Sequence, residues 1–279
     1  MIFIKILAGL VVVGVISATA WIVLHAKQTM TAPQVEQERV SAMLEAAEMP
    51  DLEPGERAFQ KAHELIAMGR AGEAKEKLLY LVNFYPGSSS APQARRILGE
   101  MNMDDLLSTE HMAGKTTHTV KRGESFVSIA NASKSNLDCL MHLNGLLDLN
   151  RLRPGDELVV MPLNLRVTVD PGKKTLTLWD GGRFVKEYGL LAAEKAGAGL
   201  RTTIDNKAGV AGERRVQAGT EGYREARKRI TLAKAGLAIG EMVAGEKSGR
   251  GFFLSGPDME ELALVLRPGN EVEILAKAP

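Results

Sequence analysis

The chain offers little thiol or imidazole chemistry. Its 279 residues include one cysteine, Cys139, and five histidines, and neither type occurs between Leu163 and Pro279. A lone cysteine excludes an intramolecular disulfide, and its apolar neighbours favour a small buried side chain over a reactive thiol. No cluster has metal-ligand spacing, and no glycine-rich loop separates a strand from a helix. The sequence therefore predicts no metal and no cofactor.

An excess of charge of one sign is also missing. Lysine and arginine number 35 against 34 aspartates and glutamates, which leaves a formal net charge of +1. This balance gives no argument for nucleic acid as a partner. Arg214-Arg215 and the stretch Arg224 to Arg229 are locally basic. This stretch either contacts anionic polymers and peptide carboxylates or is a solvated face.

The long apolar run of the chain lies at its N-terminus. Ile6 to Leu24 carry no charge and are long enough to cross a bilayer core of ~30 Å. Lys5 precedes the run, which weakly favours a cytoplasmic start. Ala18-Thr19-Ala20 resembles a signal-peptide cleavage site, but the run continues through Trp21. We expect a transmembrane anchor at residues 1–27, in preference to a cleaved signal.

Residues 28–110 have helical periodicity. One helix is expected at 34–47. Beyond it, two helices lie on either side of a turn marked by Gly69 and Gly72, and another helix begins beyond Pro86-Gly87. The pattern resembles a single tetratricopeptide repeat, whereas several stacked repeats are usually needed for stability. Residues 55–101 are therefore either a spacer or a helical hairpin that binds a protein partner.

Residues 117–162 predict a strand, two helices and a strand. Ser125 and Asn136 are expected to cap the two helices. Gly145 ends the second helix, because glycine tolerates the left-handed conformation found there. A turn at Pro154-Gly155 leads into the last strand.

This segment, with the sequence RPGDELVVMP at residues 153–162, resembles the lysin motif (LysM). LysM modules bind cell-wall glycans that contain N-acetylglucosamine. His118 and Phe126 replace the more frequent tyrosine and leucine. The resemblance implies that peptidoglycan or another such glycan binds to two adjacent loops. The corresponding residues here are Gly123, Glu124, Ser125 and Phe126 in the first loop, and Asn144, Gly145, Leu146, Leu149 and Leu152 in the second.

Residues 163–279 predict a β-rich domain. Val167 and Val169 alternate with polar residues, as do Leu176 and Leu178, and a turn at 170–172 separates the two strands. With the following strand, which ends at Tyr188, this pattern resembles the opening of L,D-transpeptidase (YkuD-type) catalytic domains. That family cross-links peptidoglycan stem peptides through a cysteine thioester.

The reactive residues of that family are absent. Its pattern is I-H-G followed by S-H-G-C-x-R, and this chain has GLAIGEM and KSGRGFF at residues 236–242 and 247–253. Gly240 and Gly249 stand at the histidine positions, Gly251 at the cysteine and Phe253 at the arginine. Acyl transfer through a thioester needs a thiolate and a group that activates it. We therefore expect a pseudo-enzyme without catalytic residues, whose open former cleft accepts a stem peptide without converting it.

Two alternatives remain. In the first, the protein is an active transpeptidase or hydrolase with an atypical nucleophile. This nucleophile is Ser248 or Ser255 with Lys247 or Glu241 as base, or, less consistently with the domain pattern, Cys139 with His142, which are three residues apart on one helix. In the second, the protein is an adaptor that acts through residues 55–101.

The predicted fold class is therefore multidomain. It comprises a transmembrane helix at 1–27, an α-helical hairpin region at 28–110, an α+β LysM module at 117–162 and a mainly-β L,D-transpeptidase-like domain at 163–279. The predicted function is a membrane-anchored, exported protein that binds or scaffolds peptidoglycan. Its predicted location is the bacterial inner membrane, with the body in the periplasm.

Overall fold

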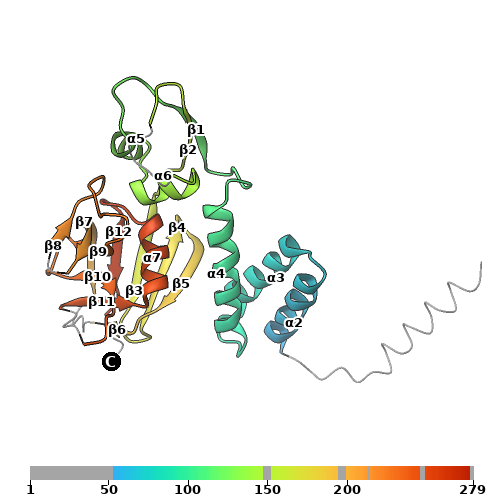
Figure 1. Cartoon of the computed structure of the whole chain (residues 1–279). Coiled ribbons are helices and arrows are strands. Elements are labelled where there is room, and N and C mark those ends of the chain that lie inside the picture. The colour runs from blue at the N-terminus through green and yellow to red at the C-terminus, as the bar shows by residue number, and fades with distance from the viewer. Residues whose placement is uncertain (1–52, 147–151, 194–198, 213, 246–248, 277–279) are drawn as a thin grey trace, which may run out of the picture. The chain divides into compact units, whose positions relative to one another are not determined.

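A computed structural model describes residues 53–146, 152–193, 199–212, 214–245 and 249–276 (Figure 1). Within these ranges the chain forms six α-helices and twelve β-strands. Residues 54–279 make up one compact unit. Helices come first along this unit, a small two-stranded module follows, and a large sheet with one helix completes it.

The predicted transmembrane helix needs correction. Residues 1–27, and the helix expected at 34–47, lie outside the described residues. Among the helices that the structure does describe, none is long and apolar enough to cross a membrane. The structure therefore does not uphold the membrane-spanning part of the predicted fold class. The predicted location at the bacterial inner membrane is not upheld either.

The helical region consists of α2 (Pro54–Ala67), α3 (Ala71–Phe84) and α4 (Ala91–Leu107). Small and apolar side chains at helical spacing fill the contact between them. Ala62, Ala74 and Leu78 are completely buried there. Phe184 from the sheet belongs to the same cluster, because α4 packs against β5 (Arg183–Gly189). A Cβ at Gly99 would lie 2.9 Å from Cγ of Lys186, so any larger residue here would require the Lys186 side chain or α4 to shift.

The small module pairs β1 (Thr116–Thr119) with β2 (Glu157–Val160) in antiparallel register. Helices α5 (Phe126–Ala132) and α6 (Leu137–Leu143) lie between the two strands in the sequence. Ser125 and Asn136 cap them as expected: each side-chain oxygen accepts a hydrogen bond from a backbone N–H three residues further on. The β-α-α-β order predicted for this segment is thus present.

The large sheet contains ten strands, in the order β5-β4-β3-β12-β7-β9-β10-β11-β6, with β8 paired to β7. Most neighbours are antiparallel, whereas β12 with β3 and β10 with β11 are parallel. The bounds not yet given are β3 (Leu165–Asp170), β4 (Thr175–Asp180), β6 (Ala192–Ala193), β7 (Leu200–Ala211), β8 (Arg214–Val216), β9 (Arg227–Leu232), β10 (Ala238–Glu241), β11 (Gly251–Leu254) and β12 (Glu271–Ile274).

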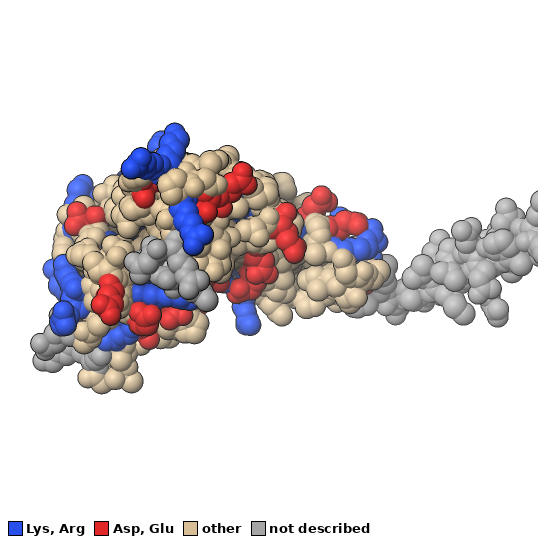
Figure 2. Space-filling model, turned by 45° about the horizontal axis from the view of Figure 1, so that its top comes forward, with Lys and Arg blue, Asp and Glu red and all other residues tan. Residues whose placement is uncertain are grey.

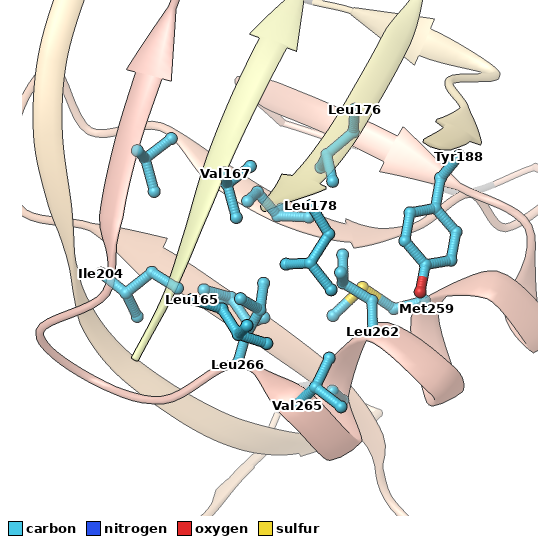
Figure 3. Close-up of a cluster of buried hydrophobic side chains, with 14 of the residues drawn as sticks. Leu165, Val167, Leu176, Leu178, Tyr188, Ile204, Met259, Leu262, Val265 and Leu266 are labelled. Atoms are coloured by element: carbon cyan, nitrogen blue, oxygen red, sulfur yellow. The ribbon is translucent and has the colours of Figure 1, made fainter. Parts of the chain in front are cut away.

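The core of this domain lies between the sheet and α7 (Gly256–Val265). Alternation along β3 buries Leu165, Val167 and Val169 on one face. Figure 3 shows Leu165 and Val167 on the side of the sheet that faces Leu262 of α7, and all three belong to the same buried cluster. The ring of Tyr188 is buried beside them, and its hydroxyl donates a 2.8 Å hydrogen bond to Oε1 of Glu261. The helix is thereby fixed to the sheet by both apolar and polar contacts.

Candidate functional site

The first predicted glycan loop joins β1 to α5. Gly123 is exposed and has a φ of +88°, which glycine adopts readily. The carboxylate of Glu124 accepts a 2.7 Å hydrogen bond from the backbone N–H of Lys121 and lies 2.9 Å from Nε2 of His118. These two hydrogen bonds lower the pKa of Glu124, and the bond from Lys121 has the larger effect. These contacts tie the Glu124 side chain to the start of the loop, and Gly123 beside it stays exposed.

Two residues of this loop have structural roles. Ser125 forms a capping box with Ser128, in which each side chain accepts from the other's backbone N–H. Phe126 is only 4% exposed and belongs to the core of the small module, with Ile129 and Leu140. A side chain in this position has no ring face open to a ligand, so the structure gives Phe126 a core position and adds nothing to the glycan role that the resemblance implies. Its spacing to Ile129 along the helix already pointed to the core.

The second predicted loop follows α6. Asn144 connects it to β2, because its Nδ2 donates to the carbonyl of Val159 and its Oδ1 accepts from the Val159 N–H. Gly145 is exposed, with a φ of +58°. Leu146 and Leu152 are half-buried and pack against the module's core. Leu149 lies outside the described residues. Among the described residues of the two loops, Gly123 and Gly145 therefore expose backbone to a ligand.

The positions matched to the transpeptidase active site are closely packed. Gly251 opens β11 opposite Ala238 of β10, and a Cβ at Gly251 would lie 1.9 Å from the Ala238 carbonyl oxygen. Gly240 and Phe253 are buried partners across the same strand pair. Gly249 is exposed, with a φ of +72°. The expectation of an open cleft left by lost side chains is therefore wrong at the β10–β11 pair, which is filled by backbone and by the Phe253 ring.

The alternative nucleophiles have ordinary surroundings where they are described. Ser255 caps α7: its Oγ accepts from the Asp258 N–H and donates to Oδ2 of Asp258 at 2.7 Å. Lys247 and Ser248 lie outside the described residues. Cys139 is fully buried, and burial raises the pKa of its thiol to about 11. His142, one turn further along α6, is exposed, so these two side chains lie in different environments.

A contact that the sequence analysis missed joins the small module to the sheet domain. Nζ of Lys207 on β7 lies 2.6 Å from Oδ2 of Asp138 on α6, and it donates to the Ala263 carbonyl of α7 at 2.6 Å. The Lys207 side chain is 5% exposed and that of Asp138 12%. Burial lowers the pKa of Lys207, and the charge of Asp138 opposes this shift.

Tyr223 strengthens this junction. The residue is 2% exposed and belongs to the core of the small module, although it follows β8 in the sheet domain. Its hydroxyl donates a 2.9 Å hydrogen bond to Oδ2 of Asp138. Burial and the charge of Asp138 raise the pKa of Tyr223, so the phenol stays protonated and keeps donating. Nζ of Lys228 lies 4.4 Å from the centre of its ring.

Asn136 makes a further bond across the junction. Its Nδ2 donates to the carbonyls of Leu264 and Leu266 at the end of α7, both at 2.9 Å. The same side chain therefore caps α6 through its oxygen and holds α7 through its nitrogen. The sequence could not predict this contact. An asparagine that caps a helix has the same local sequence pattern whether or not its Nδ2 also binds a distant carbonyl.

A pocket of about 380 Å³ opens beside this junction. We call it the junction pocket. Its walls come from α6, the residues after it, the segment before and within β9, and α7. The lining residues are Asp138, Met141, His142, Gly145, Leu146, Arg224, Ala226, Lys228, Glu260, Ala263 and Leu264.

The basic stretch at 224–229 does not form a continuous cationic face. From Arg227 onward it belongs to β9, where successive side chains point to opposite sides. Lys228 is half-buried, and its Nζ donates to the carbonyls of Tyr223 at 2.7 Å and Ala226 at 2.8 Å. On the face shown in Figure 2, basic and acidic side chains are interspersed.

Comparison with known proteins identifies the small module. Residues 118–160 match the family model of the LysM domain, so the predicted LysM domain is confirmed. No curated protein matches the chain.

Solved structures similar to the chain include three L,D-transpeptidases. One from Enterococcus faecium is 12% identical, with a TM-score of 0.31, and the match covers 40% of this chain and 50% of that one. One from Stackebrandtia nassauensis is 14% identical, with a TM-score of 0.32, over 48% and 62%. L,D-transpeptidase 1 from Mycobacterium tuberculosis is 9% identical, with a TM-score of 0.29, over 43% and 67%. The chain thus spans about half the length of the first, and likeness of this degree says nothing about activity.

Proposed function

We propose that this protein binds peptidoglycan, or another glycan that contains N-acetylglucosamine, through its LysM domain, and that its sheet domain binds or scaffolds without catalysis. The observation that carries the proposal is the LysM domain at residues 118–160. Two loops of this domain present backbone groups at Gly123 and Gly145 to solvent. Such groups suit the acetamido substituents of the sugar, which offer one donor and one acceptor.

The sheet domain supports the non-catalytic part of the proposal. It contains neither cysteine nor histidine, the two residue types that a thioester mechanism of the transpeptidase kind relies on. At Gly251 a side chain of any size would overlap the Ala238 carbonyl. A nucleophile at this position would therefore require the β10–β11 pair to separate.

Co-sedimentation of the full chain with insoluble peptidoglycan tests the proposal. Cellulose, which lacks the acetamido group, is the matched control, and chitin separates recognition of N-acetylglucosamine from recognition of peptidoglycan alone. We expect sedimentation with peptidoglycan well above that with cellulose, and muropeptides that are unchanged by mass spectrometry. Equal sedimentation with cellulose would refute specific binding, and new cross-links or released fragments would refute the non-catalytic part.

A second candidate function is protein binding through the helical region. Tyr80 is 45% exposed and Phe84 69%, and their ring centres on α3 are 5.2 Å apart. Exposed aromatic side chains of this size are enriched in protein interfaces. Binding of a partner by the full chain should then be lost in Phe84→Ser, whereas sedimentation with peptidoglycan should not change. Loss of both would indicate a folding defect.

A further inference from the structure

We propose that a groove on the sheet domain binds an extended chain that carries anionic groups, either carboxylates or phosphates. We call it the outer groove. Two adjoining cavities of about 390 and 540 Å³ form it, and both are lined by Arg166 and Glu271. Among the described residues, no member of the LysM loops and no position matched to the transpeptidase active site lines either cavity. The inference is therefore independent of the proposed glycan binding.

The strand register places the side chains of the groove in a row across the sheet. Arg166 of β3 and Thr203 of β7 are both Cα partners of Glu271 on β12. These residues alternate along their strands with core residues such as Val167 and Val272, so they lie on the face of the sheet away from α7. Polar and charged side chains from three strands therefore line one surface.

Arg166 has hydrogen-bonding capacity that the protein leaves unused. Its Nε is buried and has no hydrogen-bond partner. Its Nη1 lies 3.7 Å from Oε2 of Glu273, which is too long for a hydrogen bond. Glu273 instead accepts from Nε and Nη2 of Arg201 at 2.9 and 2.8 Å. The edge of the Arg166 guanidinium that carries Nε and Nη2 thus makes no hydrogen bond within the described part of the chain. Such an edge binds the paired oxygens of a carboxylate or phosphate.

A second unpaired donor lies beside Arg166. Trp179 of β4 is the Cα partner of Arg166, and its Nε1 is also buried without an acceptor. Both groups are N–H donors, and buried donors are normally paired. This part of the sheet therefore lacks acceptors. A ligand that supplies oxygen atoms fits it, and one that supplies only donors does not.

The charge of the lining also favours an anion. The two cavities together have four basic side chains and two acidic ones, at Arg166, Arg201, Lys234 and Arg267 and at Glu271 and Glu273. Lys234 is exposed, and its Nζ donates to the Arg201 carbonyl at 3.2 Å, which leaves further N–H donors of the ammonium for a ligand. Lys234 lines only the first cavity and Arg267 only the second, whereas Arg166 lines both. A chain with several anionic groups can span them, and a single small ion cannot.

The test measures binding of two anionic chains to the full chain by calorimetry at low salt. Poly-L-glutamate supplies carboxylates, polyphosphate supplies phosphates, and dextran is the uncharged control. We expect at least one anionic chain to bind and dextran not to bind, and the tighter anionic ligand identifies the preferred group. Binding of neither anionic chain would overturn the proposal.

Two lining residues should change the affinity in opposite directions. Arg166→Gln should weaken binding about tenfold, because charge-assisted hydrogen bonds are lost. Arg166→Lys keeps the charge without the paired donors and should fall between the two. Glu271→Gln should strengthen binding about two- to threefold, because it removes a like charge beside the ligand. Glu271 is exposed, so this variant tests the groove even if Arg166→Gln does not fold.

Arg96→Gln is the matched control, because Arg96 is an exposed arginine on α4 that lines neither cavity. It should leave the affinity unchanged, and urea denaturation of each variant shows whether it is folded. Equal weakening in Arg96→Gln and Arg166→Gln would mean diffuse attraction to the whole surface and would overturn the groove. An unchanged affinity in both folded Arg166→Gln and Glu271→Gln would overturn it as well.

Discussion

Replacing Asp138 by asparagine tests whether the LysM domain and the sheet domain form one unit. The change removes the charge that faces Lys207, whose side chain is 5% exposed. Loss of one partner of a buried ion pair costs about 3–5 kcal/mol, because the other charge stays buried without compensation. Asp138 itself is 12% exposed, and Lys207 keeps its bond to the Ala263 carbonyl. We therefore expect the lower end of that range, about 3 kcal/mol.

Urea denaturation followed by circular dichroism measures the effect on the full chain. With a slope of about 3 kcal/mol/M, a loss of about 3 kcal/mol lowers the midpoint by about 1 M. The double variant Asp138→Asn with Lys207→Met removes the orphaned charge and should recover part of the loss. A coupling free energy of about 1–3 kcal/mol is expected between the two positions, as for residues in direct contact.

Glu73→Ala provides the control for this prediction. Glu73 pairs with Arg70 at 2.6 Å, but both side chains are more than half exposed. An exposed pair of this kind contributes about 0–1 kcal/mol. If Asp138→Asn cost no more than Glu73→Ala, the junction would be solvated, and the argument that the LysM domain is fixed to the sheet domain would fail.

Three further predictions follow from single sites. The Cys139 thiol, whose pKa burial raises to about 11, should react with a thiol reagent at pH 8 only slowly in the native chain and fully in urea; fast native labelling would show that α6 is accessible. Gly251→Ala should destabilise the chain by more than about 3 kcal/mol, because its Cβ would overlap the Ala238 carbonyl. Gly249→Ala, at an exposed position, should cost only about 1–2 kcal/mol for its positive φ. Equal costs for the two variants in urea denaturation would contradict the close packing of β10 and β11. Because hydrogen bonds from Lys121 and His118 lower the pKa of Glu124, its stabilising effect should be present above the pKa of an unfolded glutamate and disappear as the pH falls through the lowered value; an NMR titration that shows Glu124 protonating at or above the ordinary value would refute this.

Sequence reasoning placed the local elements well and the contacts between domains poorly. The caps at Ser125 and Asn136 and the strands around Val167 and Leu178 were predictable, because side-chain capping and alternation are local properties. Lys207 was not, since it lies within a strand and only the fold brings Asp138 of α6 to it. Long-range ion pairs leave no periodic signal in one sequence.

Two positions in the candidate site could not be interpreted from the sequence alone, for physical reasons. Phe126 is apolar, and an apolar residue at the start of a helix can belong to a binding loop or to the core until its burial is known. Gly251 was interpreted as empty space left by a missing cysteine. A glycine also permits close backbone contact. Because a Cβ at Gly251 would lie 1.9 Å from the Ala238 carbonyl oxygen, Gly251 is in such a contact and leaves no empty space.

The ion pair at the junction should affect stability and recognition differently. In Asp138→Asn the charge that faces Lys207 is lost, whereas the amide oxygen can still accept the hydrogen bond of the Tyr223 hydroxyl. Asn136 also keeps its bonds to the end of α7. Without urea, where the chain is still folded, the variant should therefore sediment with peptidoglycan as the unmodified chain does, although its urea midpoint is lower. Weaker sedimentation under these conditions would mean that the ion pair supports the LysM loops themselves, and the sheet domain would then take part in presenting the binding site.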